Sequence, residues 1–183
     1  MIFNFKMYGN INTNYLKDNL NGLDWNEHTI RQNLFEMHKE TQTLEVMWDI
    51  ESLQTDKIGK IHPNYYKLDM ELFLEKIKPI YESNCGEGYF IRILLVKLKA
   101  NSNITPHVDT GDSLTNCKRT HIPIITNSKV TFTIGGETKY LKEGEIWEID
   151  NTKEHSVNNN SNIDRIHLLI DYKIYDKKTK SLI

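Results

Sequence analysis

The sequence has little of what marks a secreted or membrane protein. Its 183 residues include two cysteines, Cys85 and Cys117, which are too few for the disulfide framework of a small secreted domain. No apolar run approaches the roughly 20 residues that span a bilayer, and the N-terminal residues lack the charged start and apolar core of a secretion signal. We therefore expect a reduced, cytoplasmic protein with no membrane partner.

An excess of charge of one sign is also missing. The 23 lysines and arginines nearly balance 25 aspartates and glutamates, which gives a formal net charge of −2. A chain without a basic field has nothing to draw it to nucleic acid or to an anionic membrane. It contains no internal repeat, and its length suits one domain, residues 1–183, with a single core.

Residues 1–87 are expected to be mostly helical. Leucines recur at helical spacing near the start, and a capping-box pattern from Asp24 to Glu27 precedes another helical stretch. A strand is expected at residues 44–48 and the clearest helix at residues 68–81. The apolar side of that helix is predicted to consist of Leu68, Leu72, Phe73, Ile77 and Tyr81.

From residue 88 onward, the hydrophobic pattern changes to a period of two. Short strands separated by Gly or Asn turns indicate a sandwich or barrel rather than a parallel α/β sheet. Gly135-Gly136 predicts a two-residue hairpin turn. We expect a mainly β fold whose core is residues 88–175, with the helices of residues 1–87 on its outside and a frayed tail at residues 176–183. The predicted strands are residues 89–99, 119–126, 129–134, 137–141, 145–150, 155–157 and 164–172.

Three residues of the β segment form a metal-ligand set. His107 and Asp109 alternate along an extended stretch, so their side chains share a face, and Pro106 keeps the preceding residue extended. His155 follows later, at a turn after a strand. Two imidazoles and one carboxylate match the facial triad of non-haem Fe(II) oxygenases, which leaves positions on the iron open for substrate and O₂. The alternative is a His-x-Asp pattern of no consequence in a loop.

Basic residues alternate on two of the predicted strands. Arg165 and His167 share one face of the last strand, where a buried arginine is costly without an anion such as a carboxylate. The alternatives are an arginine on a half-exposed surface and a histidine that makes a hydrogen bond in the core. Arg119 and His121 form a similar pair, which either holds a second carboxylate or points into solvent.

Four stretches, taken in order, resemble the aspartyl/asparaginyl β-hydroxylase family, which includes bacterial hydroxylases of free amino acids of the proline type. The resemblance covers about residues 92–172 and reaches more weakly to residues 35–41. The stretches are residues 119–127 (RTHIPIITN), 144–149 (GEIWEI), 155–159 (HSVNN) and 164–171 (DRIHLLID).

The resemblance implies a double-stranded β-helix, which is a jelly-roll or cupin-like barrel, that binds Fe(II) and 2-oxoglutarate and uses O₂. Arg165 matches the arginine that grips the far carboxylate of 2-oxoglutarate, and Arg119 with His121 matches a pair beside the co-substrate and substrate. The residues that match the iron ligands, and so the catalytic centre, are His107, Asp109 and His155.

This chain also departs from the vertebrate-type members of the family. Those members carry a glycine at the position of Asp109, whereas this chain has the full His-x-Asp pattern. They use a serine to help bind the carboxylate, and its place falls near Val96 here.

The sequence thus predicts an Fe(II)/2-oxoglutarate-dependent dioxygenase that hydroxylates an amino acid, either free or as a residue of a peptide or protein. The short chain favours a small molecule or a short peptide. Halogenation or desaturation at the same site is an alternative, although Asp109 fills the position that a halide needs. The alternative from another class is a non-catalytic cupin-like domain that binds or senses a metal or a carboxylate.

The remaining candidates are assigned structural roles. His38 is interpreted as a residue of a helix surface, with an approach to the substrate as the alternative, and His28 and His62 are expected to be solvated. Cys117 is expected to be a small buried hydrophobe. The predicted core aromatics are Trp25, Trp48 and Trp147.

Overall fold

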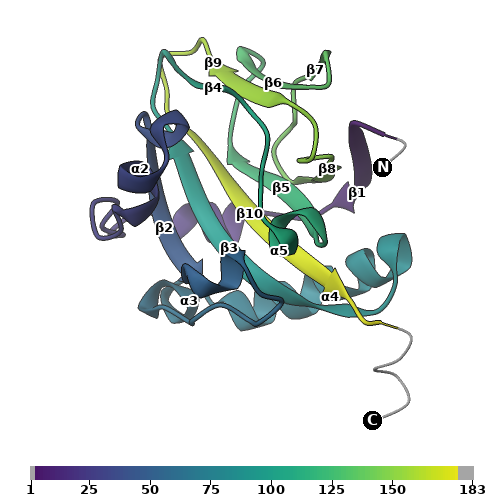
Figure 1. Cartoon of the computed structure of the whole chain (residues 1–183). Helices are drawn as coiled ribbons and strands as arrows, with labels where there is room; N and C mark the ends of the chain where they lie inside the picture. The colour runs from purple at the N-terminus through teal and green to yellow at the C-terminus, as the bar shows by residue number, and fades with distance from the viewer. Residues whose placement is uncertain (1–2, 177–183) are drawn as a thin grey trace.

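A computed structural model describes residues 3–176, which form mainly antiparallel β structure in two sheets (Figure 1). The six-stranded sheet has the order β1 (Phe5–Asn10), β8 (Glu145–Ile149), β5 (Lys118–Ile125), β10 (Arg165–Ile174), β3 (Gly88–Leu98) and β2 (Thr41–Met47). The four-stranded sheet has the order β4 (Ser102–His107), β9 (His155–Asn159), β6 (Val130–Ile134) and β7 (Glu137–Lys139). The mainly β fold is therefore confirmed, and each strand predicted after residue 88 is present.

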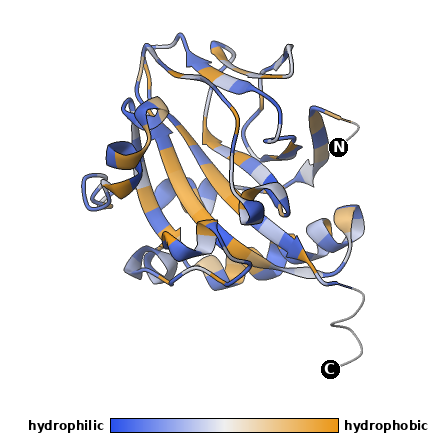
Figure 2. Ribbon diagram, in the orientation of Figure 1, coloured by the Kyte–Doolittle hydropathy of each residue, from blue (hydrophilic) through white to orange (hydrophobic). Residues whose placement is uncertain are grey.

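The long strands β3, β5 and β10 lie at the centre of the larger sheet. β10 pairs with β3 on one side and with β5 on the other, and Figure 2 shows the hydrophobic colour running along the long strands. Because side chains alternate along a strand, Ile166, Leu168 and Ile170 lie on one face of β10 and belong to the main core. Arg165 and Leu169 lie on the other face and line a cavity.

The two sheets face each other across a second apolar core. Phe5, Leu98 and Ile149 of the six-stranded sheet pack with Ile104 and Phe132 of the four-stranded sheet. The predicted hairpin turn between β6 and β7 is present, and both glycines have positive φ, 53° at Gly135 and 82° at Gly136. Residues with a Cβ atom rarely adopt these backbone angles, so glycine is favoured at both turn positions.

Helices cover the outer face of the six-stranded sheet. The helix α4 (Met70–Cys85) follows the predicted helix closely and packs Phe73, Ile77 and Tyr81 into the main core. Leu72 was predicted on the same apolar side but is exposed, because its neighbour Phe73 takes the core-facing position. The other helices are short: α1 (Asn14–Asp18), α2 (Ile30–Leu34), α3 (Pro63–Lys67) and α5 (Asp112–Thr115), with 3₁₀ turns η1 (Glu36–His38) and η2 (Glu51–Leu53).

The expectation that residues 1–87 are mostly helical is met only in part. The strand predicted at residues 44–48 is present as β2, and β1 is a second strand that the pattern did not indicate. β1 and β2 form the two edges of the six-stranded sheet. Short periodic stretches nucleate helix poorly on their own, so pairing with the sheet and packing on it override the local spacing.

The described residues do not test two of the sequence predictions. The single-domain organisation of residues 1–183 stays a prediction, and the predicted frayed tail lies, apart from Asp176, outside the described residues. Across residues 3–176, no helix combines the length and apolar character needed to cross a membrane.

Candidate metal and co-substrate site

The structure brings the three predicted metal ligands together at one end of the four-stranded sheet. His107 ends β4 and His155 begins β9, and the two are register partners whose ring centroids lie 4.2 Å apart. The Oδ1 atom of Asp109 is 4.0 Å from Nε2 of His107. Each residue offers a ligand atom within 4.8 Å of the others. Side-chain adjustments of an ångström or so place all three on a common ion, since metal–ligand bonds to N and O are about 2.0–2.2 Å long.

Both imidazoles are held in the tautomer that a metal requires. Nδ1 of His107 lies 2.8 Å from the carbonyl oxygen of Thr105, and Nδ1 of His155 lies 2.9 Å from that of Lys153. A carbonyl only accepts, so each Nδ1 carries the proton and each Nε2 keeps its lone pair. Burial lowers the pKa of His155, which also favours the neutral form that binds metal.

The carboxylate of Asp109 is oriented by two neighbours. Its Oδ2 atom accepts hydrogen bonds from Nη1 of Arg119 at 2.5 Å and from Nδ2 of Asn151 at 3.1 Å, and its backbone N–H donates to the carbonyl of Asn151. Burial opposes ionisation, but the charge of Arg119 and the hydrogen bond from Asn151 help to outweigh it and hold the pKa of Asp109 below its usual value. The carboxylate is therefore ionised, with Oδ1 left for a metal.

Arg119 belongs to a buried chain of alternating charges. Its Nε and Nη2 donate to the two oxygens of Asp171 at 2.9 and 2.8 Å, and Nε of Arg92 donates to the same carboxylate at 2.6 Å. Burial alone would lower the pKa of Arg119, but Asp171 and Asp109 outweigh it and raise that pKa well above its usual value. The predicted pair Arg119 and His121 thus faces inward, and Arg119 is already engaged with two carboxylates.

Arg165 is buried in the same cavity without an anionic partner. Its side chain is 1% exposed, its Nη2 donates to Nδ1 of His167 at 2.5 Å, and its Nε has no hydrogen-bond partner. Among residues 3–176 no carboxylate pairs with it. Burial and the positive charge of Arg31 lower its pKa from 12.5 to about 9, so it remains charged near neutral pH.

Two neutral histidines adjoin Arg165. Burial, with the charge of Arg165, holds the pKa values of His121 and His167 well below 6.5. Nδ1 of His121 and Nε2 of His167 are buried and make no hydrogen bond. The region around Arg165 therefore has one net positive charge and several unsatisfied polar atoms, which suits a carboxylate ligand.

A narrow cavity of about 30 Å³ joins these groups. Its polar lining includes the three metal-ligand residues, His121 and Arg165. Its apolar lining comes from both sheets: Val96, Ile104, Phe132, Ile149, Val157 and Leu169. Val96, the predicted place of the vertebrate-type serine, is thus aliphatic wall and offers no hydroxyl.

A second cavity of about 380 Å³, within the roughly 300–1,000 Å³ of small-molecule sites, lies against the same residues. It shares Arg31, His38, His107, Asp109 and Arg119 with the first cavity. Its apolar lining includes Phe35, Trp48, Leu53, Leu94 and Leu114. The two cavities thus meet at the metal-ligand residues.

His38 and Arg31 occupy the junction of the two cavities. The prediction that His38 lies on a helix surface is wrong: it is 7% exposed, and its ring centroid is 5.8 Å from that of His107. Burial, with the charge of Arg31, lowers its pKa far below 6.5. Nη1 of Arg31 is buried without a hydrogen-bond partner.

The sequence reasoning missed Arg31, Asn151 and the buried charges of Arg92 and Asp171. For Asp171 a signal existed, because it alternates in phase with Arg165 on the last strand. The expectation that His28 and His62 are solvated is also wrong, since their side chains are 13% and 15% exposed and flank Glu45. Cys117 is buried as expected.

The fold of this chain is similar to that of several solved structures. The structure resembles an oxidoreductase of the 2OG-Fe(II) oxygenase family from Burkholderia pseudomallei, with 13% identity over 74% of this chain and 69% of that chain and a TM-score of 0.60. It also resembles a viral collagen prolyl hydroxylase, in a 2OG complex, from Paramecium bursaria Chlorella virus-1 (9% identity, 96% and 98% coverage, TM-score 0.55). A prolyl-4-hydroxylase from Pseudomonas putida gives 8% identity, 96% and 95% coverage and a TM-score of 0.54.

At these identities the likeness establishes the fold alone. A search of curated proteins found no match. The family profile described as aspartyl/asparaginyl beta-hydroxylase matches residues 24–174, and the chain belongs to this family. The resemblance drawn from residues 92–172 is therefore confirmed, and the matched region begins well before it.

Proposed function

We propose that this protein is an Fe(II)/2-oxoglutarate-dependent dioxygenase that hydroxylates an amino acid, either free or as a residue of a peptide or protein. One cavity carries the proposal. It is lined by the candidate metal ligands His107, Asp109 and His155 and also by the guanidinium of Arg165, which has no anionic partner among the described residues. An α-keto diacid needs a metal for its keto-acid end and a cation for its far carboxylate. On this interpretation the two sheets are the predicted double-stranded β-helix.

The ligand atoms of His107, Asp109 and His155 are of the types that bind Fe(II). Two Nε2 lone pairs and the Oδ1 atom of Asp109 are the donor set that non-haem Fe(II) oxygenases use. When bound, Fe(II) with 2-oxoglutarate and O₂ supplies the oxidising chemistry that replaces an unactivated C–H bond with C–OH. The chain supplies three fixed ligands, which leave positions on the ion open for co-substrate and O₂.

For the co-substrate, we assign Arg165 to the far carboxylate of 2-oxoglutarate and His121 to a place beside it. The unpartnered Nε of Arg165 and the unpartnered Nδ1 of His121 support this assignment. Arg119 was predicted beside co-substrate and substrate. Its contacts with Asp109 and Asp171 favour a positioning role, in which it orients the carboxylate that faces the metal.

For the substrate, we assign the second cavity, with Arg31 as the contact for an acidic group. Arg31 adjoins the metal ligands, and its buried Nη1 has no hydrogen-bond partner. Burial and the charge of Arg119 lower its pKa to about 10, so an anion there relieves both its missing hydrogen bond and its repulsion by Arg119. An amino acid whose carboxylate meets Arg31, with its side chain among Trp48 and Leu94, fits this lining.

A non-catalytic domain that binds a metal and a carboxylate is the second candidate, because the same side chains serve both roles. The test is anaerobic loading with Fe(II), addition of 2-oxoglutarate and O₂, and a screen of free amino acids and short peptides for stimulated succinate formation. A hydroxylated product, 16 Da heavier by mass spectrometry, and its loss in His107→Ala support the enzyme. If the protein binds iron and 2-oxoglutarate but forms no succinate, the result would favour the non-catalytic binding domain.

A further inference from the structure

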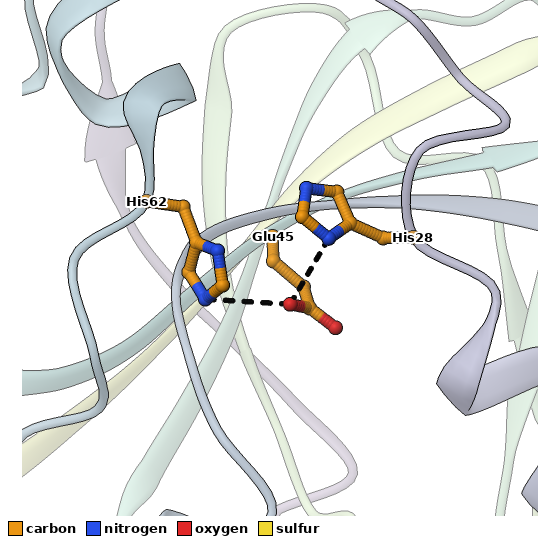
Figure 3. Close-up of side chains that lie close together, drawn as sticks. All are labelled: His28, Glu45 and His62. Carbon is orange, nitrogen blue, oxygen red and sulfur yellow. Dashed lines mark ion pairs between the residues drawn. The ribbon is translucent and has the colours of Figure 1, made fainter.

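A second group of two histidines and one carboxylate lies outside the site described above. His28 precedes α2, Glu45 lies on β2, and His62 immediately precedes α3. Figure 3 shows both imidazoles directed at the Glu45 carboxylate from different segments. Together the three residues offer one ligand atom each within 4.8 Å of one another. We call this group the β2 cluster.

The carboxylate of the β2 cluster is buried without a permanent cation. Glu45 is 5% exposed, and its register partner in the sheet is Leu94, which lines the second cavity. Among residues 3–176 no lysine or arginine pairs with it, and the ring nitrogens nearest to its carboxylate belong to the two histidines. A buried carboxylate is costly unless it is paired or coordinates a metal, so this one needs a positive partner.

The spacing of the β2 cluster matches a coordination shell. Oε2 of Glu45 lies 3.1 Å from Nδ1 of His28 and 3.3 Å from Nε2 of His62. Two ligands at about 2.0–2.1 Å from a tetrahedral zinc ion lie roughly 3.3–3.4 Å apart. The two imidazole planes are nearly perpendicular, at 89°, with ring centroids 5.1 Å apart, so both nitrogens reach a common point without ring overlap.

The far nitrogen of His28 suits a ligating histidine. Nε2 of His28 is buried and makes no hydrogen bond, and Oε2 of Glu27 lies 3.7 Å away. When Nδ1 binds a metal, the proton is on Nε2, and a small movement of Glu27 from 3.7 Å would let its carboxylate accept that proton's hydrogen bond.

At His62 a hydrogen bond competes with metal binding. Nε2 of His62 lies 2.9 Å from the carbonyl oxygen of Trp48, so in the metal-free protein this nitrogen carries the proton and donates. Metal binding at Nε2 moves the proton to Nδ1 and releases that hydrogen bond. Metal affinity therefore includes the cost of that one hydrogen bond, which coordination readily exceeds.

We propose that His28, Glu45 and His62 bind a divalent transition-metal ion of the Zn²⁺ type, with the fourth position open to water. Two imidazoles and a carboxylate are ligands that Zn²⁺ accepts, and a tetrahedral ion needs only small movements here. The ion joins the segments before α2 and α3 to β2. It thereby fixes the segment that leads to Arg31 and His38 over the first site. The proposal is independent of the proposed hydroxylase function.

The test uses a chain whose first site is disabled by His107→Ala and His155→Ala, so that zinc has no other cluster of this kind among the described residues. Zn²⁺ alone is titrated by calorimetry after chelation and buffer exchange, and Co²⁺ replaces it for absorption spectroscopy. We expect one ion per chain, a tetrahedral Co²⁺ spectrum and a higher Tm with zinc. Adding Glu45→Gln should weaken zinc binding by at least about 100-fold, more than loss of a supporting residue costs.

The matched control is Glu40→Gln in the same background. Glu40 is exposed and pairs with Lys99 on the surface, so this variant should bind zinc unchanged. Because Glu45→Gln alters a buried position, His28→Gln provides a second, milder variant, and it too should lose the zinc-dependent rise in Tm. A background chain that binds no zinc, or cluster variants that bind it as tightly as Glu40→Gln, would overturn the proposal in favour of a protonated His–Glu–His group.

Discussion

Nη1 of Arg119 lies 2.5 Å from Oδ2 of Asp109, so a buried guanidinium orients the carboxylate that a metal would use. The same guanidinium is anchored on its other side by Asp171. The position of the Asp109 carboxylate is therefore set by residues of β5 and β10, on the sheet opposite the two histidines. This relationship gives Arg119 a role that differs from that of Arg165, and the difference can be measured.

Arg119→Gln should weaken Fe(II) binding by about 10–100-fold, as loss of a residue that supports a metal ligand does. The variant leaves Oδ2 of Asp109 with Asn151 alone, so the carboxylate can turn away. Iron affinity is measured by anaerobic titration. The KM for 2-oxoglutarate is measured separately, at a saturating iron concentration. A large rise in that KM with normal iron affinity would show that Arg119 contacts the co-substrate instead.

Arg165→Gln should show the opposite pattern, with normal iron affinity and a KM for 2-oxoglutarate raised roughly 10–150-fold. That range corresponds to the loss of a hydrogen-bonded charge contact of about 1.5–3 kcal/mol. The measurement is succinate formation against 2-oxoglutarate concentration. Arg165→Lys is the companion variant, because it keeps the charge but loses the two-pronged geometry. An unchanged KM in Arg165→Gln would rule out the assigned role.

Arg31→Gln should raise the KM of an acidic substrate about tenfold or more while the KM for 2-oxoglutarate changes little, because its guanidinium borders the second cavity. The comparison needs the substrate found in the screen and its amide, which lacks the carboxylate charge. The wild-type enzyme should prefer the acid over the amide, and Arg31→Gln should lose most of that preference. Equal losses for acid and amide would contradict a carboxylate contact.

Asp171→Asn should lower the free energy of unfolding by about 3–5 kcal/mol, the usual cost of removing one partner of a buried ion pair. Asp171 is 2% exposed and accepts hydrogen bonds from both Arg92 and Arg119, so the variant leaves two guanidinium groups without their carboxylate. Urea unfolding at pH 7 measures the effect. Asp18→Asn provides a substitution of the same type at an exposed position, and it should leave the unfolding midpoint nearly unchanged.

The same carboxylate predicts how stability depends on pH. Burial opposes ionisation of Asp171, but Arg119 and Arg92 outweigh it and hold its pKa in the folded protein far below 3.8. The unfolded chain therefore binds a proton more readily than the folded protein. The stabilisation is complete above pH 3.8 and is lost as pH falls below that value. Urea midpoints between pH 7 and pH 3 should fall steeply at the acid end in the wild type and less steeply in Asp171→Asn.

Much of the fold and the centre of the site could be read from local sequence. Alternating apolar residues identified the strands after residue 88, and the His-x-Asp spacing placed two ligands on one face because side chains alternate along an extended chain. Gly135 and Gly136 identified the β6–β7 turn through the backbone angles that they permit. These features depend on neighbours a few residues apart.

The remaining site residues come from distant parts of the chain. Arg31 and His38 lie beside the candidate metal ligands. They come from a segment that was predicted to be helical, with His38 on the helix surface. His28 and His62 lie in polar stretches, yet both meet the buried Glu45. Local pattern carries no information about such contacts, because they form only when the segments pack on the sheet.

The sequence by itself determined the strands, the identity of the His–Asp–His set and the family resemblance, since each rests on residue type and short-range spacing. Tertiary structure alone decided which charges share a cavity. It placed Arg119 between Asp109 and Asp171, left Arg165 without an anion, and brought two histidines to Glu45 at an edge of the sheet, where we propose a metal site. The physical reason is that the energy of a buried charge depends on the partners and solvent around it, and both are fixed only when the chain has folded.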